Sequence, residues 1–144
     1  MSDLVKISCI IDTSDSAVPL GLEIWVDNTC VLNLESVAHQ QKFETVCSDD
    51  GEHELRFVLK NKLSEHTTVS PMGDIVKDAV LYIKNIQFDD IELGEIVSNL
   101  SVYAHDFNGT GQPTQDRFYG SMGCNGTVSL KFSTPVYLWL LENM

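Results

Sequence analysis

The stretch Gly51–Lys60, with the sequence GEHELRFVLK, decides the fold class of this chain. In an extended backbone, successive side chains point to opposite sides. One side of this stretch then carries mostly charged groups, and the other carries His53, Leu55, Phe57 and Leu59. Alternation with a period of two is typical of a strand with one buried and one solvent-facing side. We therefore expect a central strand here, with His53 as a hydrogen-bonded core residue.

Similar alternation recurs along the chain and predicts the neighbours of this strand. It is found in residues 5–11, 22–26, 30–34, 43–47, 79–88, 102–104 and 128–132. Many short strands separated by turns indicate two packed antiparallel sheets. The sequence thus predicts an all-β fold, an antiparallel two-sheet β-sandwich that is jelly-roll-like, with about seven to nine strands. We expect a single domain over residues 1–144.

Three local signals refine this fold. Asp27-Asn28 separates two alternating segments and predicts a tight turn, because both residues tolerate left-handed backbone geometry. The alternation changes phase at Lys84-Asn85, which indicates a β-bulge. Apolar residues at helical spacing predict at most one short helix, near residues 93–100.

The remaining segments lack a steady period or an exposed side. Residues 61–78 and 105–126 are predicted to form two long surface loops, the first with one helical turn or a small hairpin near Gly73. The last apolar segment, Val136–Leu141, is apolar on both faces. It predicts a strand that is central or covered by a partner subunit, and hence a homo-oligomer formed through the C-terminal strand.

Composition limits the partners and the compartment. Nine basic and 21 acidic residues give a net charge of −12. Such a surface repels phosphate backbones and anionic lipids, so we expect no nucleic-acid and no membrane partner. The four cysteines lack a CxxC pair and are expected to be free, mostly buried thiols. Without a signal peptide, the chain is expected to be made in a reducing cytoplasm and to end in a virion or outside the cell.

Part of the sequence resembles a known class of binding module. Residues 22–28 (LEIWVDN), 51–57 (GEHELRF) and 84–89 (KNIQFD) are similar to strands of β-sandwich, jelly-roll carbohydrate-binding modules. The calcium-dependent xylan-binding modules are the nearest type, and the resemblance covers residues 20–93. It implies a glycan partner and Ca2+ as a cofactor. The general style of the chain also resembles accessory or virion proteins of tailed bacteriophages.

The loop that begins at Asp106 is the candidate metal site. Oxygen-bearing side chains at its positions 1, 3 and 5, followed by glycine, are the pattern with which calcium loops wrap the ion. The predicted ligands are Asp106, Asn108, Thr110 and Asp116. Position 12, where a bidentate glutamate belongs, is Arg117. The alternative interpretation is a surface loop that satisfies its own backbone.

Aromatic side chains supply the candidate ligand-binding residues. Trp25 lies on the nominally exposed side of its strand, and Phe118-Tyr119 lies in a glycine-flanked loop. Flat rings in such places are candidate platforms for the apolar faces of sugars, and the alternative for Trp25 is packing under a loop. Asn125, from the same glycine-rich segment, completes the predicted ligand-binding set.

The sequence contains no arrangement that predicts an enzyme. A G-x-S-x-G elbow, a zinc-binding histidine pair and a phosphate-binding glycine loop are all missing. The acidic cluster Asp89, Asp90 and Glu92 is interpreted as a solvated strand edge. We therefore expect a non-catalytic carbohydrate-binding module, with or without calcium assistance. The alternative is a structural or assembly protein such as a bacteriophage virion component, with a protein surface as its partner.

Overall fold

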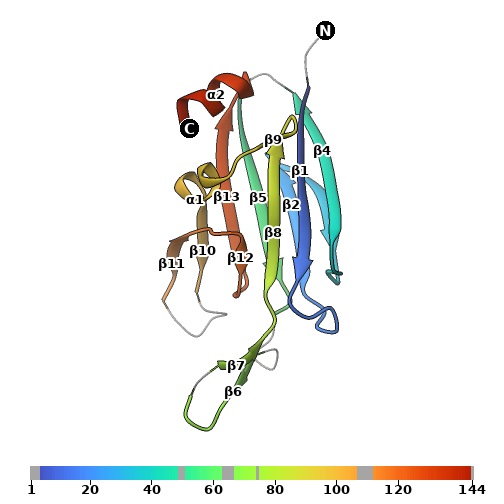
Figure 1. Cartoon of the computed structure of the whole chain (residues 1–144), viewed down its shortest axis with the longest axis vertical. Coiled ribbons are helices and arrows are strands. Elements are labelled where there is room, and N and C mark those ends of the chain that lie inside the picture. Colours follow the sequence, from blue (N-terminus) through green and yellow to red (C-terminus); the bar gives the residue numbers. More distant parts are fainter. Residues whose placement is uncertain (1–3, 49–50, 63–66, 74, 107–111, 144) are drawn as a thin grey trace.

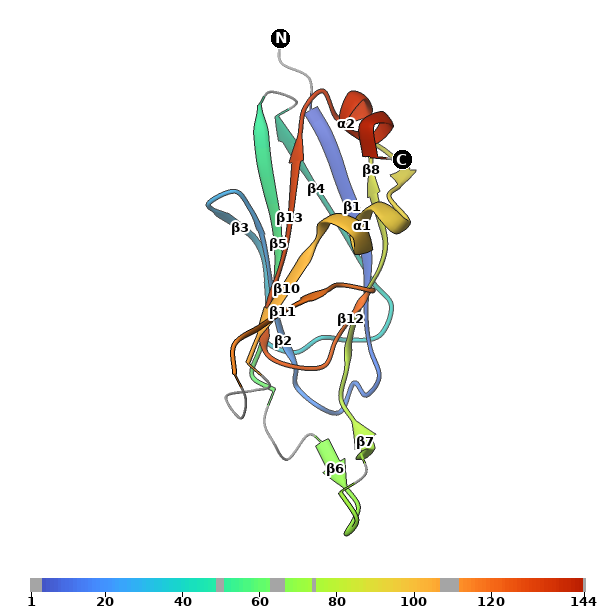
Figure 2. The same cartoon turned by 90° about the vertical axis from the view of Figure 1, so that its left-hand side faces the viewer.

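Two antiparallel sheets run side by side along the long axis of the molecule, and a small hairpin projects from one end (Figure 1, Figure 2). The computed structural model describes residues 4–48, 51–62, 67–73, 75–106 and 112–143. The strands are β1 (Leu4–Thr13), β2 (Gly21–Val26), β3 (Thr29–Leu34), β4 (Gln41–Ser48), β5 (Glu52–Lys60), β6 (Thr67–Val69), β7 (Ile75–Asp78), β8 (Leu81–Phe88), β9 (Ile91–Glu92), β10 (Val102–His105), β11 (Thr114–Arg117), β12 (Ser121–Met122) and β13 (Gly126–Ser133). The helices are α1 (Glu95–Leu100) and α2 (Val136–Asn143).

The predicted β-sandwich is confirmed, and β5 is a central strand of it. One sheet has the order β12-β8-β1-β4, with β9 added beside β8. The other has the order β11-β10-β13-β5-β2-β3. Phe57 of β5 lies opposite Val128 of β13 on one side and Ile24 of β2 on the other. The number of strands in the described residues exceeds the predicted seven to nine, because strands as short as β9 and β12 show no period in the sequence.

The inward sides of the two sheets form one hydrophobic core. Leu55, Phe57 and Leu59 are at most 2% exposed, as the period-two pattern of β5 predicts. Phe88 of one sheet contacts Phe132 of the other, with ring centroids 4.6 Å apart. Burial of each such side chain contributes about 1.5–3 kcal/mol to the free energy of unfolding. The sandwich is therefore held together by apolar contact between its layers.

The three local predictions hold. Asp27 takes a left-handed backbone with φ 55° in the turn between β2 and β3. On β8, Asn85 (φ 53°) and Ile86 together face the single residue Cys9 of β1, which is the predicted bulge. The short helix predicted near residues 93–100 is α1.

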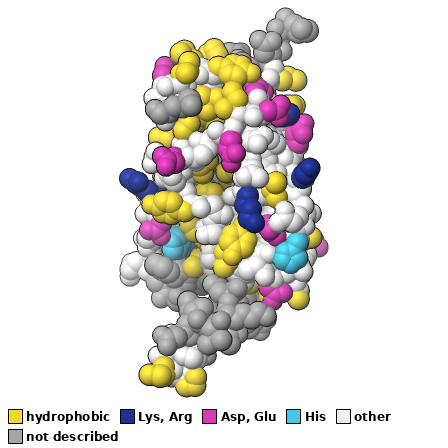
Figure 3. Space-filling view, viewed as in Figure 1, with side chains coloured by type: hydrophobic (Ala, Val, Ile, Leu, Met, Phe, Trp, Pro, Cys, Tyr) yellow, Lys and Arg dark blue, Asp and Glu magenta, His cyan; other side chains and the backbone are white. Residues whose placement is uncertain are grey.

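The C-terminal segment is a helix, so the prediction of a strand over residues 136–141 is wrong. A short run of apolar residues fits either a buried strand or a buried helix, and its period cannot distinguish them. In α2 the buried residues are Val136, Trp139 and Leu140, at the spacing of one helix face. Leu138 and Leu141 are left exposed on the other side. The segment therefore does not form the C-terminal strand through which an oligomer was predicted. Figure 3 shows hydrophobic side chains gathered at this end of the molecule.

The two long loops contain short strands that the sequence did not predict in full. Residues 61–78 include the hairpin β6–β7, which agrees with the hairpin expected near Gly73. Residues 105–126 include β11, which pairs with β10, and β12, which pairs with β8. Neither helix in the described part of the chain is long and apolar enough to cross a membrane.

All four cysteines are free thiols, as predicted, but their burial differs. Cys9 lies in the core, and burial raises the pKa of its thiol to about 12. Cys47 is half-buried, whereas Cys30 on β3 is exposed, so the expectation of buried thiols fails there. The reason is a register shift between Ile24 and Trp25, which pairs Cys30 with Trp25 on the outer side of the sheet.

A buried carboxylate at the end of β1 joins three segments. Asp12 is 7% exposed and lies within hydrogen-bond distance of His39 Nδ1 (2.9 Å), Gln40 Nε2 (2.7 Å) and Lys84 Nζ (3.1 Å). The backbone N–H of Thr13 donates to the same carboxylate. The contact with His39, then that with Thr13 and then that with Lys84 lower the pKa of Asp12 well below its usual range.

This carboxylate predicts an acid-sensitive part of the stability. A carboxyl group with a lowered pKa in the folded state stabilises the fold above its unfolded pKa of about 3.9 and loses that contribution at lower pH. The difference in free energy of unfolding between wild type and Asp12→Asn should be largest near neutral pH. It should shrink as the pH falls below about 4. Urea titrations across this range measure the difference, and a constant difference would contradict the assignment.

Candidate ligand-binding site

Trp25 is half-buried and its ring is engaged by neighbouring charged groups. The indole N–H donates to Glu23 Oε1 at 2.9 Å, and the Arg56 guanidinium lies 5.5 Å from the ring centroid. The ion pair with Lys60 and then the indole hydrogen bond lower the pKa of Glu23. Trp25 therefore belongs to a polar network on the outer side of its sheet, and one face of the ring is covered by Arg56.

Phe118 and Tyr119 have opposite surroundings. Phe118 is fully buried, whereas Tyr119 is 75% exposed. Successive residues in an extended segment point to opposite sides, so only one of the two rings can face solvent. The prediction that Phe118 offers an exposed platform is therefore wrong. Tyr119 keeps the exposure that a platform needs.

Tyr119 borders a cleft of about 340 Å³ between β8, α1 and the segment that joins β11 to β12. Apolar side chains from the core and polar side chains from the surface meet in it. The residues that line it are Ile83, Asn85, Ile86, Glu92, Gly94, Glu95, Val97, Ser98, Phe118, Tyr119 and Gly120. Its volume lies within the range of about 300–1,000 Å³ usual for small-molecule sites.

Backbone geometry on two sides brings Asn85 and Tyr119 to this cleft. Asn85 is the bulge residue of β8 and is exposed, and a bulge re-aims a side chain relative to a regular strand. Gly120 has φ 98°, a conformation that suits glycine, and its carbonyl accepts the N–H of Ile83 at 2.9 Å. The Tyr119 segment is thus fixed against β8, where Ser121 continues the pairing in β12.

The polar groups of the cleft are mostly acceptors. Glu92 and Glu95 are exposed carboxylates, and the Ser98 hydroxyl donates to the Glu95 backbone carbonyl at 3.1 Å. No lysine or arginine is among the lining residues. An exposed ring beside an apolar surface with amide and carboxylate groups at the rim suits an uncharged, hydroxyl-rich ligand. An anionic ligand would meet like charge here.

The candidate calcium ligands are divided between described and undescribed residues. Asp106 is exposed and lines a depression of about 700 Å³ at the end of the β10–β11 hairpin. The Asp116 carboxylate lies 2.7 Å from His105 Nε2. Asn108 and Thr110 lie outside the described residues. Within the described ranges, no group of three or more His, Cys, Asp or Glu side chains is arranged to hold a metal ion.

Asn125 has a structural contact. Its side-chain amide donates to the carbonyl of Lys62 at 2.8 Å, and its side-chain oxygen accepts the N–H of Lys62 at 2.9 Å. The amide therefore ties the end of β5 to the segment before β13. Asn125 also lines the depression beside Asp106, so it lies near the candidate calcium loop.

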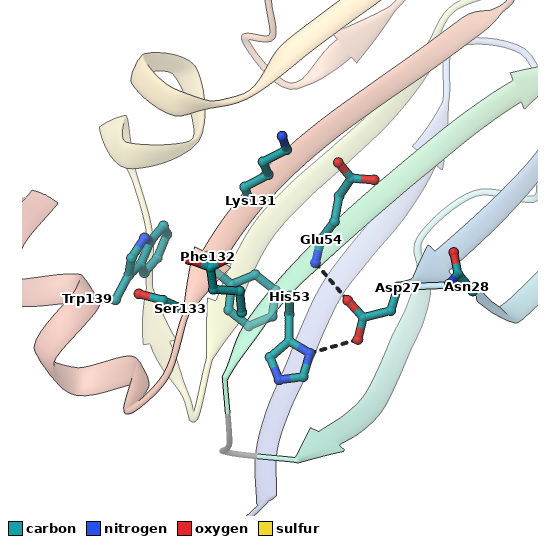
Figure 4. Close-up of a pocket in the computed structure, with 9 residues that line it drawn as sticks. Asp27, Asn28, His53, Glu54, Lys131, Phe132, Ser133 and Trp139 are labelled. Atoms are coloured by element: carbon teal, nitrogen blue, oxygen red, sulfur yellow. Dashed lines mark hydrogen bonds and ion pairs between the residues drawn. The ribbon is translucent and has the colours of Figure 1, made fainter.

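A second cavity, of about 530 Å³, surrounds an ion pair that sequence analysis did not identify (Figure 4). Asp27 Oδ2 lies 2.7 Å from His53 Nδ1, and Asp27 Oδ1 accepts the N–H of Glu54 at 3.0 Å. The other ring nitrogen, His53 Nε2, lies 2.8 Å from the carbonyl of Ser48. His53 is hydrogen-bonded, as predicted, and its side chain is 8% exposed, but the residue as a whole is half-buried at the edge of the core.

The arrangement around His53 supports the fold and offers no free base. Each ring nitrogen faces an acceptor, so neither is available to take a proton from a ligand. Burial opposes ionisation of Asp27, but the hydrogen bonds from His53 and from the Glu54 N–H outweigh it, and the pKa of Asp27 is lowered. The carboxylate thereby fixes the turn between β2 and β3 to β5.

Comparison with known proteins identifies the fold. No family model and no curated protein matches the sequence. The solved selenomethionine form of vCBM60, a calcium-dependent carbohydrate-binding module, matches with a TM-score of 0.57 over 88% of this chain and 89% of that chain, at 14% identity. A structure of vCBM60 in complex with galactobiose matches with a TM-score of 0.54 over 87% and 96%, also at 14% identity.

The chain has the vCBM60 fold. The likeness seen in residues 20–93 of the sequence is thus confirmed at the level of the fold, and it extends over most of the chain. The identity of 14% leaves individual side chains unassigned by this comparison. The cleft at Tyr119 therefore depends on the geometry of this chain rather than on a correspondence with vCBM60.

Sequence reasoning identified Tyr119 and its neighbour Phe118 but not the rest of the cleft. The change of phase at Asn85 indicated a bulge, and Glu92 was noted as part of an acidic cluster. Neither observation indicated that these residues lie near Tyr119. The link is the pairing of β12 with β8, which joins residues almost forty positions apart and leaves no sequence pattern. Glu95 and Ser98 carry no signal beyond the helical spacing of their segment.

The turn at Asp27 gives a test of what fixes β2 to β5. Asp27→Ala removes both acceptors and places alanine at φ 55°, a left-handed backbone conformation that is unfavourable for it. The two effects together should lower the free energy of unfolding by about 2–4 kcal/mol. Asp27→Asn keeps one acceptor and a side chain that tolerates this φ, so it should cost about 1–2 kcal/mol. Urea unfolding at neutral pH measures both. Equal losses would contradict this account, because the two variants differ in the retained acceptor and in their tolerance of the left-handed backbone.

Proposed function

We propose that this chain is a non-catalytic carbohydrate-binding module that binds a neutral oligosaccharide at the Tyr119 cleft. The observation that carries the proposal is the ring of Tyr119, 75% exposed beside a cleft whose other walls are apolar and whose rim is amide and carboxylate. A sugar presents apolar C–H groups on its ring faces and hydroxyl groups around its edge. The cleft matches both parts of that surface.

The shared fold supports the same class of ligand. vCBM60 is a carbohydrate-binding module, and one of its structures holds galactobiose. The net charge of −12 and the two carboxylates of the cleft favour a neutral glycan over a uronic-acid or sulfated one. His53, whose nitrogens both face acceptors, supplies no free base at the cavity of Figure 4. This favours binding over catalysis.

Substitution of Tyr119 tests the binding site. Tyr119→Ala should weaken binding of a neutral oligosaccharide by about tenfold or more, because truncating an aromatic anchor costs more than about 1 kcal/mol. Tyr119→Phe should bind nearly as well, since the stacking face is kept. A glycan array of neutral and acidic oligosaccharides selects the ligand, and calorimetry measures the affinity.

The matched control is Tyr137→Ala, which removes a tyrosine that is 54% exposed on α2. It should leave glycan affinity unchanged. The proposal fails if no array glycan binds, or if Tyr119→Ala binds as tightly as wild type.

We further propose that Ca2+ assists this module through the loop that contains Asp106. The support is the oxygen-rich pattern of Asp106, Asn108, Thr110 and Asp116, the exposure of Asp106, and the calcium dependence of vCBM60. Two features count against a complete site. Arg117 stands where a bidentate glutamate is usual, and the Asp116 carboxylate already contacts His105. A weak site, completed by backbone oxygens of the loop, fits these residues best.

Thermal unfolding with and without calcium tests this ion site. An ion that binds only the folded state should stabilise it by about 2.7 kcal/mol at a hundred times its Kd, and so raise the Tm. The rise should disappear on addition of a chelator and in Asp106→Ala, while Mg2+ should give little effect. Glu44→Gln, which removes an exposed carboxylate of β4, is the control and should keep the rise. A Tm unaffected by calcium would contradict the calcium proposal, but it would not contradict the proposal that a glycan binds at the Tyr119 cleft.

A further inference from the structure

A groove of about 260 Å³ lies between α1 and α2, beside β9. Its apolar lining comes from all three elements, through Ile91, Leu93, Ile96 and Leu140. Leu93, Ile96 and Leu140 are buried members of the core, so the groove ends on core side chains rather than on polar backbone. Its apolar lining differs from that of the Tyr119 cleft, which lies on the β8 side of α1, but the two share Glu92 and Glu95.

The side of α2 that faces away from this groove is also apolar. On α2, Tyr137 is 54%, Leu138 55% and Leu141 71% exposed, and Ile91 of β9 is 37% exposed. Figure 3 shows hydrophobic side chains gathered over α2, with acidic side chains around them. Single exposed apolar residues are normal on a protein surface, but a continuous apolar patch beside a groove marks an interaction site.

The charged side chains that line the groove or belong to α2 are acidic. Glu92 and Glu95 line the groove, and Glu142 is exposed on α2. No lysine or arginine occurs in the described segments 91–100 and 136–143. A second copy of this chain would bring like charges together, since each chain carries −12. A partner segment with positive charge would meet complementary charge instead.

We propose that this groove binds a basic amphipathic segment of a partner protein. Apolar side chains of the segment would lie in the groove against Ile91 and Leu140, and its lysines or arginines would face Glu92 and Glu95. Recognition of an amphipathic helix by an apolar groove works in this way, with apolar anchors at helical spacing. The segment would not contact Tyr119, although Glu92 and Glu95 line both the groove and the glycan cleft.

Chemical-shift mapping on the full chain tests the surface. The probe is a synthetic helical peptide of leucine and lysine at amphipathic spacing, with a version in which glutamate replaces every lysine. The lysine peptide should shift amide signals of residues 91–100 and 136–143, and the glutamate peptide should not. The variant Ile91→Ser should bind the lysine peptide about tenfold more weakly, because Ile91 lines the groove and its side chain is 37% exposed there rather than buried in the core.

Two control variants separate this surface from others. Val46→Ser removes a side chain that is 52% exposed on β4, and Tyr119→Ala removes the ring of the glycan cleft; both should bind the peptide as wild type does. The proposal is overturned if the peptide shifts signals elsewhere, or if Ile91→Ser binds the peptide as tightly as wild type. It is also overturned if sizing shows a dimer that Ile91→Ser abolishes, because the occupant is then a second copy.

Discussion

The contact between Phe88 and Phe132 is the interaction on which the rest of the structure depends. It joins the two sheets through rings 4.6 Å apart. Trp139 of α2 contacts both rings, at 5.7 Å and 6.1 Å, and His53 stacks on Phe132 at 5.3 Å. Four elements, β5, β8, β13 and α2, are thus fixed by one aromatic cluster. Its hydrophobic burial is the large term, and aromatic contact adds about 0.5–1.5 kcal/mol per pair.

This cluster also explains why the surface features occur where they do. Trp139 anchors α2 to the core, and the opposite side of the helix must then carry Leu138 and Leu141 into solvent. His53 links the cluster to Asp27 and so to the β2–β3 turn. The cavity of Figure 4 lies between these parts and is lined by members of the cluster. It is the space beside a structural ion pair, and Asp27 and His53, the two members of that pair, already have partners.

Much of the sandwich could be predicted from the sequence, because every second residue is apolar in a strand with one buried side. β5 and the bulge at Asn85 follow directly from that rule. The rule fails for Val136–Asn143, where apolar residues fill both the buried and the exposed sides of the segment. It also fails for β9 and β12, which are too short to show a period. Both strands are placed by their pairing with β8, and for β12 the partner lies almost forty positions earlier in the sequence.

The candidate site shows the same division between local and long-range information. Exposure of Tyr119 follows from a glycine-flanked segment, and burial of its neighbour Phe118 follows from alternation, although the sequence could not say which ring faces out. The cleft exists only because α1 stands between the Tyr119 segment and α2. Glu92 and Glu95 line both the cleft and the groove. A basic partner in the groove would neutralise carboxylates that also face the cleft, so the two sites would be coupled, and any such coupling must be reciprocal.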